Sequence, residues 1–288
     1  MRLRLFAAAL AFAIIISVTV CAETDTVDPA APSQDGTMPA LTAIAGYGMM
    51  DSQSYSDLQE LSDDIGGRVT GSPQAAKAIE WGVAKMREIG LSNVHAEKWQ
   101  ISRGWTRVSA DAALTAPIQR RLVVDSMGWV GSTPKGGVEG EVVPVDINQL
   151  DDALKANSSK WAGKIILIVS KGEPSKDRQA RLQNFLKFGP FLKKAYEAHA
   201  IGVIGGQGGS TAAGMRLTHT GALGFDTYYD MPVVSMIAED QEQLERFLDA
   251  GKTVRMKLDV QNRVTDGPVD TANVVGDIPG TEHPEQVV

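Results

Sequence analysis

Apolar residues recur at helical spacing in the first part of the chain. Between residues 40 and 65 they return every three or four positions, which predicts helix. The positions with this spacing are Tyr55, Leu58, Leu61 and Ile65. Three glycines then break the pattern within residues 64–72. Arg68 lies in this glycine-rich turn, where we expect it to hold the loop in place through charge-assisted hydrogen bonds.

A second helix is predicted directly after the turn. Ser72 is suited to cap it, Pro73 to occupy its first turn, and Gly90 to end it. Ser72 stands in a Gly-Ser context that superficially resembles a nucleophile, but capping explains it better. The positions expected to form the buried stripe of this helix are Ile79, Val83, Met86 and Ile89. Residues 94–101 are expected to form a strand of the same unit.

The pattern changes near Pro117, after which short apolar runs alternate with helical segments. The run at residues 164–169 is apolar throughout, which is typical of a strand buried on both faces. The other expected strands are 122–124, 141–145, 201–206, 232–237, 254–260 and 272–278, and the expected helices are 185–199 and 239–250. Asp266-Gly267-Pro268 marks a second boundary.

The N-terminus has the features of a secretion signal. Arg2 and Arg4 precede an almost wholly apolar stretch at residues 5–20, and cleavage after Ala22 fits the small residues there. The apolar stretch is short for a membrane span, which needs about 20 residues, so a retained anchor is the weaker alternative. Residues 23–39 are expected to form a flexible leader. We therefore expect a secreted or periplasmic protein with no stable membrane span once the signal is removed.

Composition excludes several functions. The formal net charge is −7, and an acidic chain does not favour nucleic acid as a partner. Cys21 is the only cysteine and would leave with the signal, so disulfides, thiolate metal sites and a cysteine nucleophile are not expected in the mature chain.

The four histidines are scattered, and none stands in a His-Glu-x-x-His or similar metal-binding pattern. His219 is the one candidate for binding or an interface, because it lies in a loop rich in glycine and threonine. No catalytic or metal-ligating residue is assigned in this chain.

Residues 61–73, LSDDIGGRVTGSP, resemble the opening of metallopeptidase family 28, in particular its carboxypeptidase Q-like branch of zinc exopeptidases. The resemblance continues at Trp81, Met86, 90–94 and Glu97, and it resumes at 131–134.

The middle of the chain resembles a protease-associated domain inserted into such peptidases. Residues 273–280 resemble the return to the peptidase domain. The segments that resemble the inserted domain are 163–167, 200–204, 219–226 and 232–235.

The resemblance implies an α/β fold with a mixed sheet flanked by helices and a β-rich insert. The implied organisation is a signal peptide at 1–22, a leader at 23–39, the first part of the peptidase domain at 40–116, the protease-associated insert at 117–265, and the return to the peptidase domain at 266–288.

The resemblance also implies hydrolysis of peptides or dipeptides by water activated between two zinc ions. The family's first zinc ligands follow a strand that here begins at residues 286–288, so we expect the chain to stop before them and to be inactive alone. The alternative is a non-catalytic binding or interaction module built around the protease-associated domain; dimer contacts would suit such a surface, and a homodimer is compatible with either hypothesis.

Overall fold

The computed structural model describes residues 36–156, 158–171, 178–205, 228–281 and 283, and it divides the chain into two units, residues 1–57 and 58–288. The first unit contains helix α1 (Thr37–Met50), and α2 (Ser54–Gln59) begins in it. Helix α1 starts inside the segment expected to be a flexible leader, so residues 37–39 are helical. It carries no charged residue, and Ile44, Met49 and Met50 are exposed.

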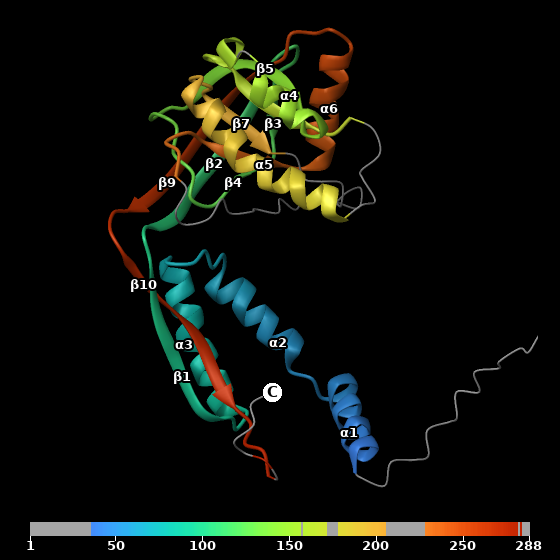
Figure 1. Ribbon diagram of the computed structural model, residues 1–288, viewed down its shortest axis with the longest axis vertical. Coiled ribbons are helices and arrows are strands. Elements are labelled where there is room, and N and C mark those ends of the chain that lie inside the picture. The colour runs from blue at the N-terminus through green and yellow to red at the C-terminus, as the bar shows by residue number, and fades with distance from the viewer. Residues whose placement is uncertain (1–35, 157, 172–177, 206–227, 282, 284–288) are drawn as a thin grey trace, which may run out of the picture. The chain divides into compact units, whose positions relative to one another are not determined.

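The second unit begins with one turn of π-helix, η1 (Glu60–Ile65), followed by the glycine-rich turn and helix α3 (Pro73–Glu88). Helix α3 packs on a two-stranded antiparallel sheet made of β1 (Ser92–Ile101) and β10 (Val269–Asp277). Gly82 of α3 faces Val274 of β10, because a side chain added there would contact the valine. We call this pair of strands the β1–β10 ribbon (Figure 1).

A larger, eight-stranded sheet is built from the chain between the two ribbon strands. Its order is β3-β2-β9-β5-β6-β7-β8-β4. The central strands β5, β6, β7 and β8 are parallel, and the remaining pairs are antiparallel. The strand bounds are β2 (Gly104–Ala116), β3 (Arg120–Leu122), β4 (Val124–Ser126), β5 (Val138–Asp146), β6 (Ile165–Val169), β7 (Gly202–Gly205), β8 (Val233–Met236) and β9 (Arg255–Thr265).

Helices cover both faces of this sheet, and the alternation along β6 separates the two cores. Ile166 and Ile168 pack with residues of α4 (Leu150–Lys155) and α5 (Arg178–Glu197), whereas Ile165 and Leu167 pack with α6 (Ala238–Asp249) and with β2 and β9. Helices α4 and α5 lie together on one side of the sheet (Figure 1). All five β6 residues are buried, as their continuous apolar run predicts. The expected mixed sheet flanked by helices is confirmed.

Short 3-10 turns precede two of these elements, η2 (Ile147–Gln149) before α4 and η3 (Ser158–Trp161) before β6. Lys194 of α5 donates to the carbonyls of Ala153, Leu154 and Ala156 at the end of α4. A cation at this end of a helix satisfies carbonyls that lack helical partners. Lys194 therefore fixes α4 to α5 on this side of the sheet.

Three sequence expectations need correction. Ile89 was placed in the buried stripe of the second helix but is 71% exposed. Strand β2 was not predicted, and its residues pair with β9 in the larger sheet. Helix α5 begins at Arg178, well before the expected residue 185.

Within the part of the chain that the structure describes, no helix is both long and apolar enough to cross a membrane. The signal segment at residues 1–22 and the expected strand at 286–288 lie outside that part.

The different burial of Ile166 and Ile89 predicts different losses of stability when each is replaced by alanine. Ile166 is fully buried beneath α5, so Ile166→Ala should lower the free energy of unfolding by about 2–5 kcal/mol. The matched control, Ile89→Ala, removes the same atoms from an exposed position and should change it by less than about 0.5 kcal/mol. Urea unfolding followed by circular dichroism measures both, and equal losses would contradict this account of the core.

Candidate functional site

Ser72 caps helix α3. Its backbone is extended (φ −84°, ψ 160°), and its side-chain oxygen accepts a hydrogen bond from the amide of Ala75 at 3.1 Å. Pro73 follows at the first helical position, where a missing N–H has no consequence. The Ser72 side chain is buried and turned to its own helix, which is the geometry of a capping residue.

Arg68 closes the π-helix η1. Its Nη1 donates to the carbonyl of Leu61 and, at 2.8 Å, to the carbonyl of Gly66. The carbonyl of Leu61 also accepts from the amide of Gly66 at 3.1 Å, which completes the wide π-helical turn. Gly66 adopts φ +81°, a left-handed conformation that glycine reaches without strain. Arg68 thus fixes the turn by donating to two of its carbonyls, one of which also takes part in the π-helical hydrogen bond.

Glu60, at the start of η1, joins this turn to helix α3. Its carboxylate accepts from Trp81 Nε1 at 2.7 Å, and Lys85 Nζ lies 3.5 Å from its other oxygen. The Trp81 hydrogen bond is the main cause that holds the pKa of Glu60 below its ordinary value; partial burial opposes it, and the charge of Lys85 adds to it. The sequence did not indicate a role for Glu60, because its partner Trp81 lies 21 positions further along the chain.

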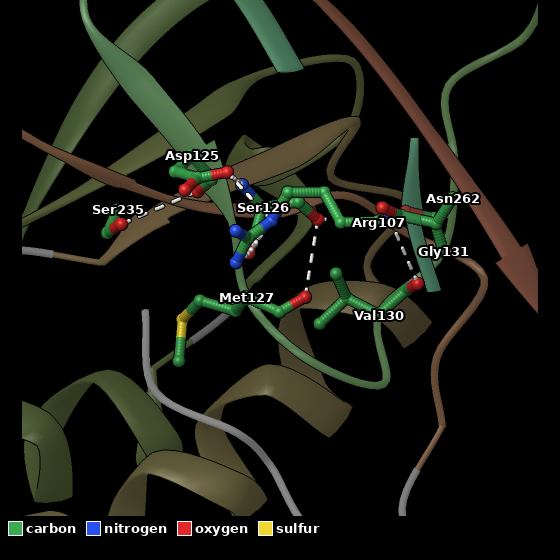
Figure 2. A network of polar contacts seen from close by, with 8 residues as sticks. All are labelled: Arg107, Asp125, Ser126, Met127, Val130, Gly131, Ser235 and Asn262. Atoms are coloured by element: carbon green, nitrogen blue, oxygen red, sulfur yellow. Dashed lines mark hydrogen bonds and ion pairs between the residues drawn. The ribbon is translucent and has the colours of Figure 1, made fainter. Parts of the chain in front are cut away.

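A second polar network, which sequence reasoning missed, ties four strands of the larger sheet together (Figure 2). Arg107 of β2 forms an ion pair with Asp125 of β4 at 2.7 Å and donates to the carbonyl of Ser126 at 2.8 Å. Ser235 of β8 donates to the carbonyl of Asp125 at 3.4 Å. The ion pair and these hydrogen bonds thus hold β2, β4 and β8 together.

Asn262 of β9 supports the segment that follows β4. Its side-chain nitrogen donates to Ser126 Oγ at 3.0 Å, to the carbonyl of Gly131 at 3.0 Å and to that of Val130 at 3.3 Å (Figure 2). Its backbone amide donates a further hydrogen bond to Ser132 Oγ at 2.9 Å. We call residues 126–133 the strap. Its hydrogen bonds serve to position it against β9.

Histidine and carboxylate groups do not converge on a metal site in the described ranges. Across those residues, no group of three or more His, Cys, Asp or Glu side chains could hold an ion. His95, on the β1–β10 ribbon, lies with Nδ1 2.6 Å from the carbonyl of Asn93 and Nε2 3.8 Å from Glu97. His219 lies outside the described residues, so its binding role stays a prediction. The described site residues therefore build supports for loops and strands.

Comparison with known proteins gives the chain its relatives. No family model matches it. It is 29% identical over 255 residues to carboxypeptidase Q of the mouse, Mus musculus, and 28% identical over 255 residues to the human protein; each match covers 86% of this chain and 50% of the relative. The chain thus spans about half the length of the curated relatives it matches.

Among solved structures, a peptidase M28 precursor from Shewanella amazonensis has a similar fold. The TM-score is 0.70 at 24% sequence identity, and the match covers 84% of this chain and 54% of that chain. A similar fold therefore occurs in a second protein with a different sequence.

The cap at Ser72 predicts an unusual order of two substitutions. Ser72→Ala should destabilise the chain by about 1 kcal/mol, whereas Ser72→Gly should cost only a few tenths, since glycine is tolerated at a cap and alanine is not. Thermal unfolding of both variants measures this order. A larger loss for glycine than for alanine would show that residue 72 acts as a helix-interior position.

The support of the strap by Asn262 predicts a second contrast. Asn262→Ala removes the donor from three partly buried acceptors and should lower the free energy of unfolding by about 1–3 kcal/mol. Asn148→Ala, the control, removes one exposed hydrogen bond to the carbonyl of Lys171 and should cost less than about 1 kcal/mol. Comparable losses in urea unfolding would contradict the role given to Asn262.

Proposed function

We propose that the chain belongs to metallopeptidase family 28 and supplies the N-terminal part of an exported, zinc-dependent exopeptidase that acts on peptides or dipeptides. The observation that carries this is the similarity to carboxypeptidase Q, which extends over 86% of the chain and so through both the ribbon and the larger sheet. The fold shared with an M28 peptidase supports the same reading. Export rests on the signal features of residues 1–22.

The two sheets take different parts in this proposal. The β1–β10 ribbon with α3 is the beginning of the peptidase domain, and the sheet from β2 to β9 is the inserted protease-associated domain. The support is topological: the chain leaves the ribbon from β1 into β2 and returns from β9 into β10, and both pairs of strands are neighbours. An inserted domain needs its entry and exit close together, because the host fold must close around them.

Zinc does not fit the residues described. Peptidases of this kind use metal-activated water, with a carboxylate as general base and the ions stabilising the oxyanion. Within the described ranges no three ligand side chains converge, so no step is assigned to Arg68, Ser72 or the network around Arg107. In this proposal the zinc ligands and the general base belong to residues other than those described, and the chain's own residues shape and support the surrounding fold.

The alternative function is a non-catalytic module for binding or interaction. One observation favours it: the most connected polar side chains of the described residues hold strands together. Such a module would use the surface of the larger sheet and its helices to contact a partner, and it would need no zinc.

Reading the coding sequence beyond Val288 and assaying its product separates the two functions. The peptidase proposal predicts a downstream Gly-Gly-His-x-Asp segment with further Asp, Glu and His ligands. The product that contains them should hydrolyse dipeptides or aminoacyl substrates, and a chelator should abolish its activity. The 288-residue chain, as the matched control, should show no zinc-dependent turnover.

An intact gene that lacks such residues would overturn the peptidase proposal and leave the binding module. Zinc-dependent hydrolysis by the 288-residue chain alone would instead show that the ligands lie within it.

A further inference from the structure

The chain crosses between the two sheets at two adjacent linkers. Residues 102–103 join β1 to β2, and residues 266–268 join β9 to β10. Strand pairing stops at this level on both sides, since the last pair of the ribbon is Ile101 with Val269 and the first of the larger sheet is Gly104 with Thr265. Gly267 has φ +83°, a conformation that suits glycine. Two short linkers side by side are the geometry of a hinge, in which a few residues absorb a rotation.

Two tryptophans form a clasp across these linkers. Trp105 of β2 donates from Nε1 to the carbonyl of Val130 in the strap at 2.9 Å. Trp129 of the strap donates from Nε1 to the carbonyl of Arg103, in the first linker, at 3.1 Å. Both rings are almost fully buried in one cluster with Ile101 of the ribbon. Trp105 thus bonds to the strap, and Trp129 of the strap bonds to the first linker. Both buried indole N–H groups therefore have an acceptor, as burial requires.

Trp129 adopts φ +56°, in the left-handed region. A bulky residue enters this region only when its surroundings hold it there, because its Cβ crowds the backbone. The hydrogen bond to Arg103 and the burial of the ring supply that hold. The backbone strain at Trp129 is therefore tied to the linker it contacts.

Further contacts surround the first linker. A side chain added at Gly104 would lie 3.0 Å from Val269 and 3.3 Å from the carbonyl of Gly71, so these three segments pack without space between them. On the other side of the linker, the guanidinium of Arg103 lies 4.6 Å from the centre of the Tyr228 ring, a cation–π contact. Contacts from three parts of the chain thus converge on one linker.

We infer that residues 102–103 and 266–268 form a two-stranded hinge, and that the clasp of Trp105 and Trp129 locks it. The clasp sets the orientation of the larger sheet relative to the ribbon. Its release frees that orientation while the larger sheet stays folded on its own two cores. The ribbon stays folded through its strand pairing and its packing against α3. This device does not depend on the chain being a peptidase.

Double electron–electron resonance on the full chain tests the hinge. With Cys21 replaced by serine, spin labels at Lys77 of α3 and Glu242 of α6 report the orientation between the sheets, and labels at Lys160 and Glu242 report the larger sheet alone. All three positions are exposed. In Trp129→Phe and Trp105→Phe the distance distribution between the sheets should at least double in width, while the distribution within the larger sheet stays unchanged.

The matched control is Trp161→Phe, which alters a buried tryptophan in the core beneath α5, away from the hinge. It should leave the distribution between the sheets narrow. Tyr228→Leu weakens only the contact to Arg103 and should give a smaller broadening. The inference fails if the clasp variants keep the narrow distribution, or if the two label pairs broaden equally. If the tryptophan variants do not fold, an unchanged distribution in Tyr228→Leu overturns it.

Discussion

The pairing of two continuous strands, β1–β2 with β10–β9, is the constraint on which the second unit depends. These strands lie antiparallel along both sheets and are interrupted only at the two short linkers. Because the pairing joins residues far apart in the sequence, such as Gly104 and Thr265, the intervening chain must fold as a loop that starts and ends at one place. The eight-stranded sheet is that loop, and the strap and its tryptophans pack where it starts and ends.

The order of the larger sheet imposes a further condition. Its two end strands, β3 and β4, are separated along the chain by Val123 alone, so the sheet must roll until its ends meet. Backbone pairing does not close this seam, and polar side chains hold it. Arg107 reaches from β2 to Asp125 of β4, while the buried carboxylate of Asp240, at the start of α6, accepts from the amide of Val123 at 2.7 Å and pairs with Arg120. Paired in this way, a carboxylate can be buried without a large desolvation cost.

Local signals predicted much of this fold, and non-local contacts explain what they missed. The cap at Ser72, the glycine-rich turn and the apolar run of β6 all follow from neighbouring residues. Strand β2 was missed because it contains small and polar residues, such as Ser109 and Ala113, that have little strand preference of their own. Its partner β9 supplies the pairing from far along the chain. The Arg107 and Asn262 contacts escaped prediction for the same reason, since spacing in the sequence cannot show which distant strands become neighbours.

If the proposed function is right, the described residues build the frame of a peptidase, and zinc binding belongs to other residues. Native mass spectrometry of the purified 288-residue chain, after incubation with zinc and dialysis, tests this most directly. The account predicts a folded protein at the mass of the polypeptide without metal. One or two zinc ions retained in a fixed ratio would contradict it, because the proposed function gives this chain no zinc site of its own.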